Sequence, residues 1–180
     1  PLLPVKGKPI IEHVIASILK IKDVTEIFIV CNDKFFPEFH AWQKAFKCPV
    51  ECHILNDGTK TPETRLGQIG DIQYVISRAK IHDDVLIVAG DNLFNFSLVD
   101  AYEVFKSKKT LVNPLFDCKD MKTASEQGTV VIDKDGKFLE FMEKSPTPKT
   151  TLISQGVYFV PKDKVKLFEK YISDGNNADK

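Results

Sequence analysis

The feature that most constrains the fold is an apolar run at residues 85–89 (VLIVA), which ends in Gly90 and Asp91. A short apolar run that closes on a glycine and a carboxylate is poorly suited to a helix or to an exposed loop. It instead predicts a buried parallel strand, which is covered on both faces and is therefore apolar throughout. Such a strand delivers Asp91 to its carboxyl end, the edge at which open α/β sheets bind ligands. A carboxylate at that edge can hold a divalent metal ion against a phosphate.

The segments before this run alternate between helical and strand-like patterns. Apolar residues recur at helical spacing over residues 10–19, 36–46 and 66–79, and strand-like runs occupy residues 26–31, 50–55 and 84–90. A helix between successive strands predicts right-handed crossover connections and a mostly parallel sheet. We therefore expect an α/β fold.

The pattern changes in the second half of the chain. An Asp-Gly turn at residues 133–136 (DKDG) lies between two strand-like runs, 128–133 and 137–143, and predicts a β-hairpin added to the sheet. The other expected elements are helices at 98–106 and 162–171 and strands at 110–116 and 152–160. The sheet is thus predicted to be mixed in this half.

Charge and cysteine content exclude several classes of protein. The 25 basic and 25 acidic residues cancel, so no overall basic field favours nucleic acid or an anionic membrane. No apolar run approaches the roughly 18–20 residues that span a bilayer. Cys48 and Cys52 form a C-x3-C pair without a second pair, and His53 would point to the opposite face of a strand, so zinc binding by these thiols is disfavoured. Free thiols favour a reducing cytoplasm, and we expect a cytoplasmic protein.

Four segments resemble, in their order and spacing, the sugar-1-phosphate nucleotidyltransferases, the family of glucose-1-phosphate thymidylyltransferase and UTP–glucose-1-phosphate uridylyltransferase. They are residues 2–11 (LLPVKGKPII), 88–94 (VAGDNLF), 141–144 (FMEK) and 155–159 (QGVYF). Each motif alone is weak, whereas the ordered set is specific and covers nearly the whole chain. The resemblance implies the Rossmann-like three-layer nucleotide-diphospho-sugar transferase fold. It also implies one domain over residues 1–180, with a nucleotide half at about 1–95 and a sugar half at about 96–180.

The resemblance also implies a reaction. In this family a phosphate oxygen of a sugar 1-phosphate attacks the α-phosphorus of a nucleoside triphosphate in line, and pyrophosphate leaves. UTP or dTTP is favoured, the cofactor is Mg²⁺, and the product is a nucleotide-diphospho-sugar. Catalysis of this kind depends on alignment of two anions and stabilisation of the moving charge. The partners are therefore the two substrates, with no nucleic acid or membrane, and homo-oligomerisation is left open.

Three residues match the catalytic and sugar-binding positions of the family. Asp91 matches the catalytic aspartate that binds the metal; the alternative is that it caps the following helix. Lys144 matches the catalytic lysine that contacts the sugar phosphate, and Glu143 matches the glutamate that accepts sugar hydroxyls; the alternative for both is an exposed, charged strand end. Ser145 stands where the family has proline, and Pro146 follows one residue later.

Five further residues match substrate-binding positions. By the same resemblance, Asn56, which ends a strand, Gly67, which enters a helix, and Asn92 are expected to bind the nucleotide. A glycine there lets the backbone approach the base, and helix-entry amides can meet phosphate. Gly128 and Gln155 are expected to line the sugar pocket.

Other family features are expected outside this sequence. A Gly-x-Gly-Thr-Arg loop and a lysine would precede Pro1, and a second metal-binding aspartate would follow the sugar-binding strand. We therefore expect the parent protein to be an enzyme and this chain alone to be impaired. The alternatives are a catalytically inactive nucleotidyltransferase-like binding or regulatory domain, a CTP-dependent phosphocholine-type cytidylyltransferase, and an unrelated doubly wound domain.

Overall fold

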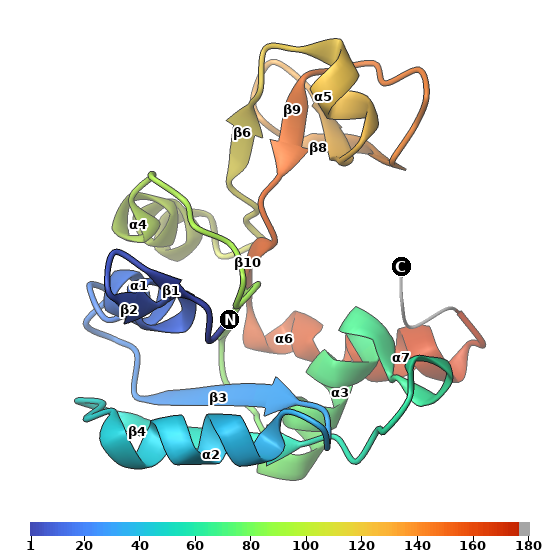
Figure 1. The fold of residues 1–180 in the computed structure, drawn as a ribbon. Coiled ribbons are helices and arrows are strands. Elements are labelled where there is room, and N and C mark those ends of the chain that lie inside the picture. The colour runs from blue at the N-terminus through green and yellow to red at the C-terminus, as the bar shows by residue number, and fades with distance from the viewer. Residues whose placement is uncertain (177–180) are drawn as a thin grey trace.

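A computed structural model describes residues 1–176 (Figure 1). The strands are β1 (Pro4–Val5), β2 (Lys8–Pro9), β3 (Glu26–Cys31), β4 (Glu51–Asn56), β5 (Val85–Val88), β6 (Leu115–Asp117), β7 (Gly128–Ile132), β8 (Phe138–Glu143), β9 (Leu152–Ser154) and β10 (Val157–Val160). The helices are α1 (Ile10–Ile18), α2 (Phe36–Ala45), α3 (Gly67–Ala79), α4 (Leu98–Lys108), α5 (Met121–Ser125), α6 (Lys162–Val165) and α7 (Leu167–Ser173), with a 3₁₀ turn, η1 (Pro62–Thr64). Helices and strands alternate from α1 to β7, so the predicted α/β class is confirmed.

Strands β3 and β4 form a parallel ladder, as predicted for this half. Cys31 pairs with Asn56 at the carboxyl end, and Glu26 pairs with Glu51 at the amino end. One face of the ladder packs against α1 and α2 around the buried side chains of Ile15, Ile27 and Phe39. The apolar alternation of both strands places every second side chain on this face.

The prediction of a parallel partner for β5 was wrong within the described residues. Strand β5 pairs with β10 in an antiparallel ladder, with Val88 opposite Val157 and Val85 opposite Val160. The other strand pairs among the described residues, apart from β3–β4, are also antiparallel, so a mostly parallel sheet does not describe the pairing. An apolar run reports burial on both faces, whereas the direction of its neighbour depends on a segment that returns from far along the chain.

The predicted hairpin forms in the second half. Asp133 closes its turn, since its carboxylate accepts hydrogen bonds from the main-chain nitrogens of Asp135 (2.9 Å) and Lys137 (2.8 Å). Strands β7 and β8 join β6 and β9 in a four-stranded sheet. This sheet and α5 make up a distal lobe, residues 115–154, which stands apart from the other elements in Figure 1.

The strand predicted at residues 152–160 is divided into two. Strand β9 belongs to the distal lobe, and β10 pairs with β5 in the body of the protein. The break falls at Gly156, whose φ of +66° is incompatible with a continuous strand and favours glycine. The chain therefore passes from one sheet to another at Gln155 and Gly156.

The remaining differences are local. The strand predicted at 110–116 is reduced to β6, although Val112 makes an isolated bridge to Phe159. The helix predicted at 162–171 is split into α6 and α7, and α7 lies beside α3 (Figure 1). Among residues 1–176, no helix is both long and apolar enough to cross a membrane.

Candidate functional site

Asp91 lies just beyond the carboxyl end of β5 with its side chain exposed. Within the described part of the chain, its carboxylate has no hydrogen bond and no ion pair. The alternative interpretation of Asp91 as a helix cap is wrong, because Ser97 caps α4 by accepting a hydrogen bond from the main-chain nitrogen of Asp100 (3.3 Å). The Asp91 carboxylate thus projects from the strand end with its oxygens available to a ligand.

The segment after Asp91 is tied to the break between β9 and β10. The side-chain amide of Asn92 donates to the backbone carbonyl of Gln155 (2.8 Å), and the main-chain nitrogen of Ala89 donates to the carbonyl of Gly156 (2.9 Å). A methyl group on Gly156 would lie 2.9 Å from the Ala89 Cβ, so glycine permits this approach. Three predicted site residues, Asp91, Asn92 and Gln155, are therefore brought together at one strand edge. Gln155 joins this edge through its main-chain carbonyl.

The N-terminal motif folds beside the same edge. A Cβ on Gly90 would lie 3.8 Å from Cγ of Pro1, and the Pro1 carbonyl accepts a hydrogen bond from the Ile11 nitrogen (3.0 Å). Strands β1 and β2 form a short hairpin, which His13 anchors through a contact of 2.8 Å between its Nε2 and the Val5 carbonyl oxygen. The first and second sequence motifs thus meet at the carboxyl end of β5.

Glu143 and Lys144 lie at the end of β8, in the distal lobe. Their charged groups are 3.9 Å apart (Lys144 Nζ to Glu143 Oε1), and both side chains are largely exposed. Lys144 has a φ of +45°, which is uncommon for a residue with a side chain. Its main-chain nitrogen donates to the Gln127 carbonyl (3.1 Å), which holds the turn in place. The exposure of both side chains agrees with the interpretation of this pair as an exposed, charged strand end. That interpretation does not explain the left-handed backbone of Lys144.

Gly128 pairs with Glu143 across the β7–β8 ladder. A Cβ on Gly128 would lie 2.8 Å from Cζ of Phe141 and 3.0 Å from Oε2 of Glu143. The absence of a side chain at Gly128 therefore leaves room for both neighbours. This contact brings together Gly128, Glu143 and Lys144 as a second group of predicted site residues.

Asn56 ends β4, and its side chain is engaged at both of its polar atoms. Its Nδ2 donates to Oδ1 of Asp33 (2.8 Å), and its Oδ1 accepts from the Gly58 nitrogen (2.8 Å). Its carbonyl accepts from the Tyr74 hydroxyl (2.7 Å), which ties the strand to α3. Gly67, buried with a φ of +75°, begins α3. Asn56 thus organises this loop in the present conformation.

Asp33, which bonds to Asn56, is a further polar residue at this edge that the sequence motifs do not single out. It follows β3 by two residues, and its second carboxylate oxygen lies 4.0 Å from the Lys60 Nζ. The sequence signal that could have found Asp33 is its place just after a strand. Cys31 and Asn56 pair at the carboxyl ends of β3 and β4, so polar residues after both strands lie at the same edge of the sheet. Burial raises the pKa of the neighbouring Cys31 thiol to about 11, with smaller contributions from the charges of Asp57 and Asp71. Cys31 is therefore a protonated, structural thiol at neutral pH.

The predicted residues thus fall into separate places in the structure. Asp91, Asn92 and Gln155 lie together at the end of β5, Gly128, Glu143 and Lys144 lie in the distal lobe, and Asn56 and Gly67 lie around the end of β4 and the start of α3. Between residues 1 and 176, no hydrogen bond or ion pair links Lys144 to Asp91.

A sequence family described as Nucleotidyl transferase matches residues 1–179. The chain is 26% identical over 172 residues to the bifunctional protein GlmU of Methanocaldococcus jannaschii, covering 94% of this chain and 36% of that protein. It is 23% identical over 188 residues to a UTP–glucose-1-phosphate uridylyltransferase of Synechocystis, covering 99% of this chain and 47% of the relative. A Sulfolobus acidocaldarius protein assigned as a mannose-1-phosphate guanyltransferase is 27% identical over 165 residues, covering 90% of this chain and 42% of its own length.

A solved structure supports the fold. The crystal structure of a Bacillus anthracis protein assigned as a glucose-1-phosphate thymidylyltransferase superimposes with a TM-score of 0.75 at 23% identity. The superposition covers 96% of this chain and 65% of the other, so the expected Rossmann-like fold is confirmed. The chain spans between about one third and one half of the length of the three relatives named above.

Proposed function

The chain belongs to the nucleotidyl transferase family, and from this premise we propose that it serves a sugar-phosphate nucleotidyltransferase. The proposed reaction joins a nucleoside triphosphate to a sugar 1-phosphate. A phosphate oxygen of the sugar phosphate forms a bond to the α-phosphorus, and the bond from the α-phosphorus to the bridging oxygen of pyrophosphate breaks. The products are a nucleotide-diphospho-sugar and pyrophosphate.

The observation that carries the proposal is the edge formed by Asp91, Asn92 and Gln155. The Asn92–Gln155 hydrogen bond joins two motifs that are 63 residues apart in the sequence. It fixes the strand end from which the Asp91 carboxylate projects. A rigid scaffold that presents one acid at a strand edge is suited to positioning phosphates, where alignment supplies much of the catalysis.

Asp91 fits a role as a Mg²⁺ ligand. Mg²⁺ prefers oxygen ligands and is often held by one or two carboxylates together with substrate phosphates and water. The exposed Asp91 carboxylate, which has no partner within residues 1–176, offers such oxygens. When bound, Mg²⁺ would supply Lewis-acid stabilisation of phosphate charge.

Lys144 and Glu143 are proposed to hold the second substrate. The ammonium of Lys144 is a point charge suited to the phosphate of the sugar phosphate, and Glu143 can accept hydrogen bonds from sugar hydroxyls. The turn at Lys144 and the space above Gly128 hold the two side chains next to each other. Asn56 and Gly67 are proposed to bind the nucleotide at the end of β4.

UTP or dTTP is proposed as the nucleotide. Support comes from the uridylyltransferase among the relatives and from the likeness of the fold to a thymidylyltransferase. A relative assigned as a guanyltransferase makes the purine nucleotides the necessary comparison. The described cysteines are free thiols, which supports a cytoplasmic location for this enzyme.

The test is pyrophosphate release by the full-length protein with Mg²⁺, across UTP, dTTP, CTP, GTP and ATP and a set of sugar 1-phosphates. We expect turnover with UTP or dTTP, and a loss of about 10²–10³-fold in kcat for Asp91→Asn, since one stabilising contact to the moving charge is removed. Asp135→Asn, in the exposed turn of the β7–β8 hairpin, is the matched control and should retain the parent rate.

Other outcomes would select the alternatives. Turnover limited to CTP with phosphocholine would assign a cytidylyltransferase. Thermal stabilisation by nucleotides without turnover of any pair would assign a binding domain. Full activity of Asp91→Asn would remove Asp91 from the mechanism while leaving the reaction in place.

A further inference from the structure

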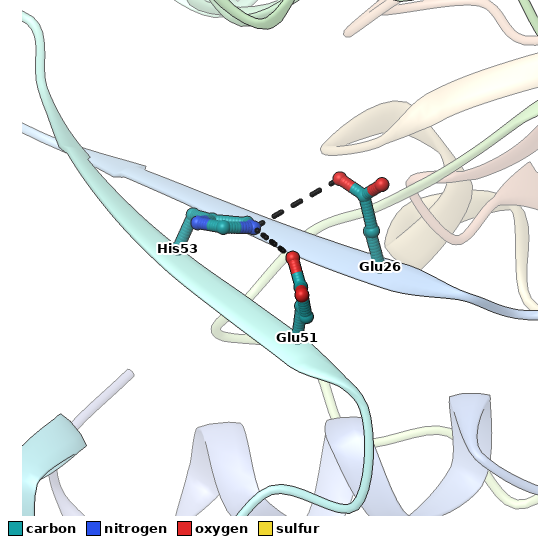
Figure 2. Close-up of side chains that lie close together, drawn as sticks. All are labelled: Glu26, Glu51 and His53. Carbon is teal, nitrogen blue, oxygen red and sulfur yellow. Dashed lines mark ion pairs between the residues drawn. The ribbon is translucent and has the colours of Figure 1, made fainter.

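We propose that Glu26, Glu51 and His53 form a binding site for a divalent transition metal ion, with Zn²⁺ as the preferred occupant. One ligand atom from each residue lies within 4.8 Å of the other two. Figure 2 shows the three side chains converging from the neighbouring strands β3 and β4. This site is independent of the proposed nucleotidyl transfer.

The parallel register of β3 and β4 creates the cluster. Glu26 pairs with Glu51, and His53 follows Glu51 by two residues on the same strand. Residues two apart on a strand share one face, and neighbouring strands are about 4.8 Å apart, so the three side chains rise side by side. The opposite face of the ladder carries Ile27 and Cys52, which pack toward α1 and α2. The cluster is thus on the face turned away from these helices.

Both contacts of the His53 imidazole are too long for hydrogen bonds, and the shorter one has the spacing of two ligands of one metal ion. Nε2 of His53 lies 3.5 Å from Oε2 of Glu51 and 3.8 Å from Oε2 of Glu26. Hydrogen bonds between nitrogen and oxygen are shorter, at about 2.7–3.2 Å. Ligands about 2.0–2.2 Å from a tetrahedral zinc ion are about 3.3–3.6 Å from each other. A small adjustment of the exposed glutamates would therefore complete three positions of a tetrahedron.

The imidazole ring is already oriented for binding. Phe28, which pairs with His53 across the ladder, stacks on its ring with centroids 4.9 Å apart and an interplanar angle of 19°. This stacking holds the ring plane while Nε2 points toward the two carboxylates (Figure 2). Over residues 1–176, the ion-pair contacts of both carboxylates are with His53. A divalent cation would neutralise the repulsion between these two acids.

One imidazole nitrogen and two carboxylates are poor ligands for Mg²⁺, the ion proposed to bind Asp91. Imidazole favours zinc and related transition metals, whereas Mg²⁺ prefers oxygen ligands alone. Three protein ligands also leave a fourth position for water. The cluster lies at the amino ends of β3 and β4, whereas Asn56 ends β4 at the other edge of this ladder. The proposed zinc ion therefore bridges two strands at a distance along β4 from the residues proposed to bind the nucleotide.

Isothermal titration of the metal-stripped, full-length protein with Zn²⁺ tests this proposal, alongside the visible spectrum with Co²⁺. We expect the Co²⁺ absorption of a four-coordinate site, and we expect His53→Gln to lose it together with one bound Zn²⁺. Glu51→Gln and Glu26→Gln should each weaken Zn²⁺ binding by at least about 10–100-fold, the loss typical of a residue that only orients a ligand. The expected binding is reversible, because the three side chains are partly or largely exposed.

Matched variants separate this site from other ligands. His82→Asn removes an exposed histidine outside the cluster, and Asp91→Asn removes the proposed Mg²⁺ ligand, so both should bind Zn²⁺ as the parent does. Unchanged thermal unfolding of His53→Gln without metal would show that its fold is intact. The proposal is overturned if the parent binds no Zn²⁺, if His53→Gln binds it as tightly, or if Cys48→Ser with Cys52→Ser abolishes binding while His53→Gln does not.

Discussion

The side-chain amide of Asn92 donates a hydrogen bond of 2.8 Å to the backbone carbonyl of Gln155, across 63 residues of sequence. Asn92→Asp replaces this donor with a carboxylate that faces a carbonyl oxygen. We expect a loss of about 1–3 kcal/mol in the free energy of unfolding, because a half-buried carbonyl oxygen loses its donor and faces a negative charge instead. Chemical denaturation measures this loss. Asn95→Asp, at an exposed position nearby, should change stability little, and equal effects of both variants would contradict the role of the bond.

Gly156 is required for two separate reasons, its positive φ and its approach to Ala89. A methyl group there would lie 2.9 Å from the Ala89 Cβ, whereas Gly136, with a φ of +77°, has no atom within 4 Å of an added Cβ. Both alanine variants suffer the backbone strain, so the difference between them reports the steric contact alone. We expect Gly156→Ala to be less stable than Gly136→Ala by about 1–3 kcal/mol. Thermal unfolding of the two proteins provides the comparison, and equal stabilities would show that Ala89 moves aside freely.

Gly128 allows Phe141 and Glu143 to occupy the space above it. In Gly128→Ala the new methyl group meets both side chains at 3.0 Å or less, so we expect Glu143 to be displaced. Under the proposed function, KM for the sugar phosphate should rise by about tenfold, the effect of roughly 1.4 kcal/mol of lost binding, while KM for the nucleotide stays near the parent value.

A second substitution tests the steric cause. Phe141→Leu removes the ring that the methyl group would strike, so Gly128→Ala with Phe141→Leu should recover part of the lost KM. If the double variant has the same KM for the sugar phosphate as Gly128→Ala, the clash between the new methyl group and the Phe141 ring is not the cause of the raised KM.

Local patterns were sufficient to predict most of the secondary structure. Helical spacing gave α1, α2, α3 and α4 closely, and the Asp-Gly turn gave the β7–β8 hairpin. These features depend on residues close in sequence, so a single chain reports them well. The antiparallel pairing of β5 and the break at Gly156 depend on contacts with distant segments. The apolar run of β5 predicts cover on both of its faces, whereas its residues are only half-buried in the structure.

The same distinction holds for the sites. The motifs predict Asp91, Asn92 and Gln155 as site residues through a family resemblance, and the structure adds the hydrogen bond that joins the last two. The alternation expected of a strand places His53 and Cys52 on opposite faces, and the packing of Cys52 confirms this. It does not bring Glu26 to His53, because the register of two strands about 25 residues apart in sequence cannot be read from either strand alone.

The left-handed backbone of Lys144 allows its structural and chemical roles to be separated. Lys144→Gly and Lys144→Ala both remove the ammonium, so both should lose most of the proposed activity. Glycine adopts a φ of +45° without strain, whereas alanine does not, so the glycine variant should be more stable by about 1 kcal/mol. The same pair of substitutions at Lys134, which is not left-handed, should give the opposite order, because glycine there only adds backbone freedom. Urea denaturation of the four variants decides between these orders.

The thiols of Cys31 and Cys52 predict a dependence of reactivity and stability on alkaline pH. Burial raises the pKa of each thiol to about 11, with further contributions from Asp57 at Cys31 and from Cys48 at Cys52. An unfolded thiol titrates at about 8.5, so the folded protein holds these protons more tightly. The resulting stabilisation is fully present below about pH 8.5 and is lost as the pH rises toward 11.

Two measurements check this sign. Because the thiolate is the reactive species, alkylation of Cys31 and Cys52, followed by mass spectrometry, should be slow at pH 8 and should accelerate up to about pH 11. The second measurement is the free energy of unfolding between pH 8.5 and 11. The double variant Cys31→Ser with Cys52→Ser should lose less of it than the parent, since neither serine titrates in this range. Cys118→Ser should lose as much as the parent. If Cys31 and Cys52, which are half-buried, react at pH 8 as fast as a small free thiol, burial does not protect them.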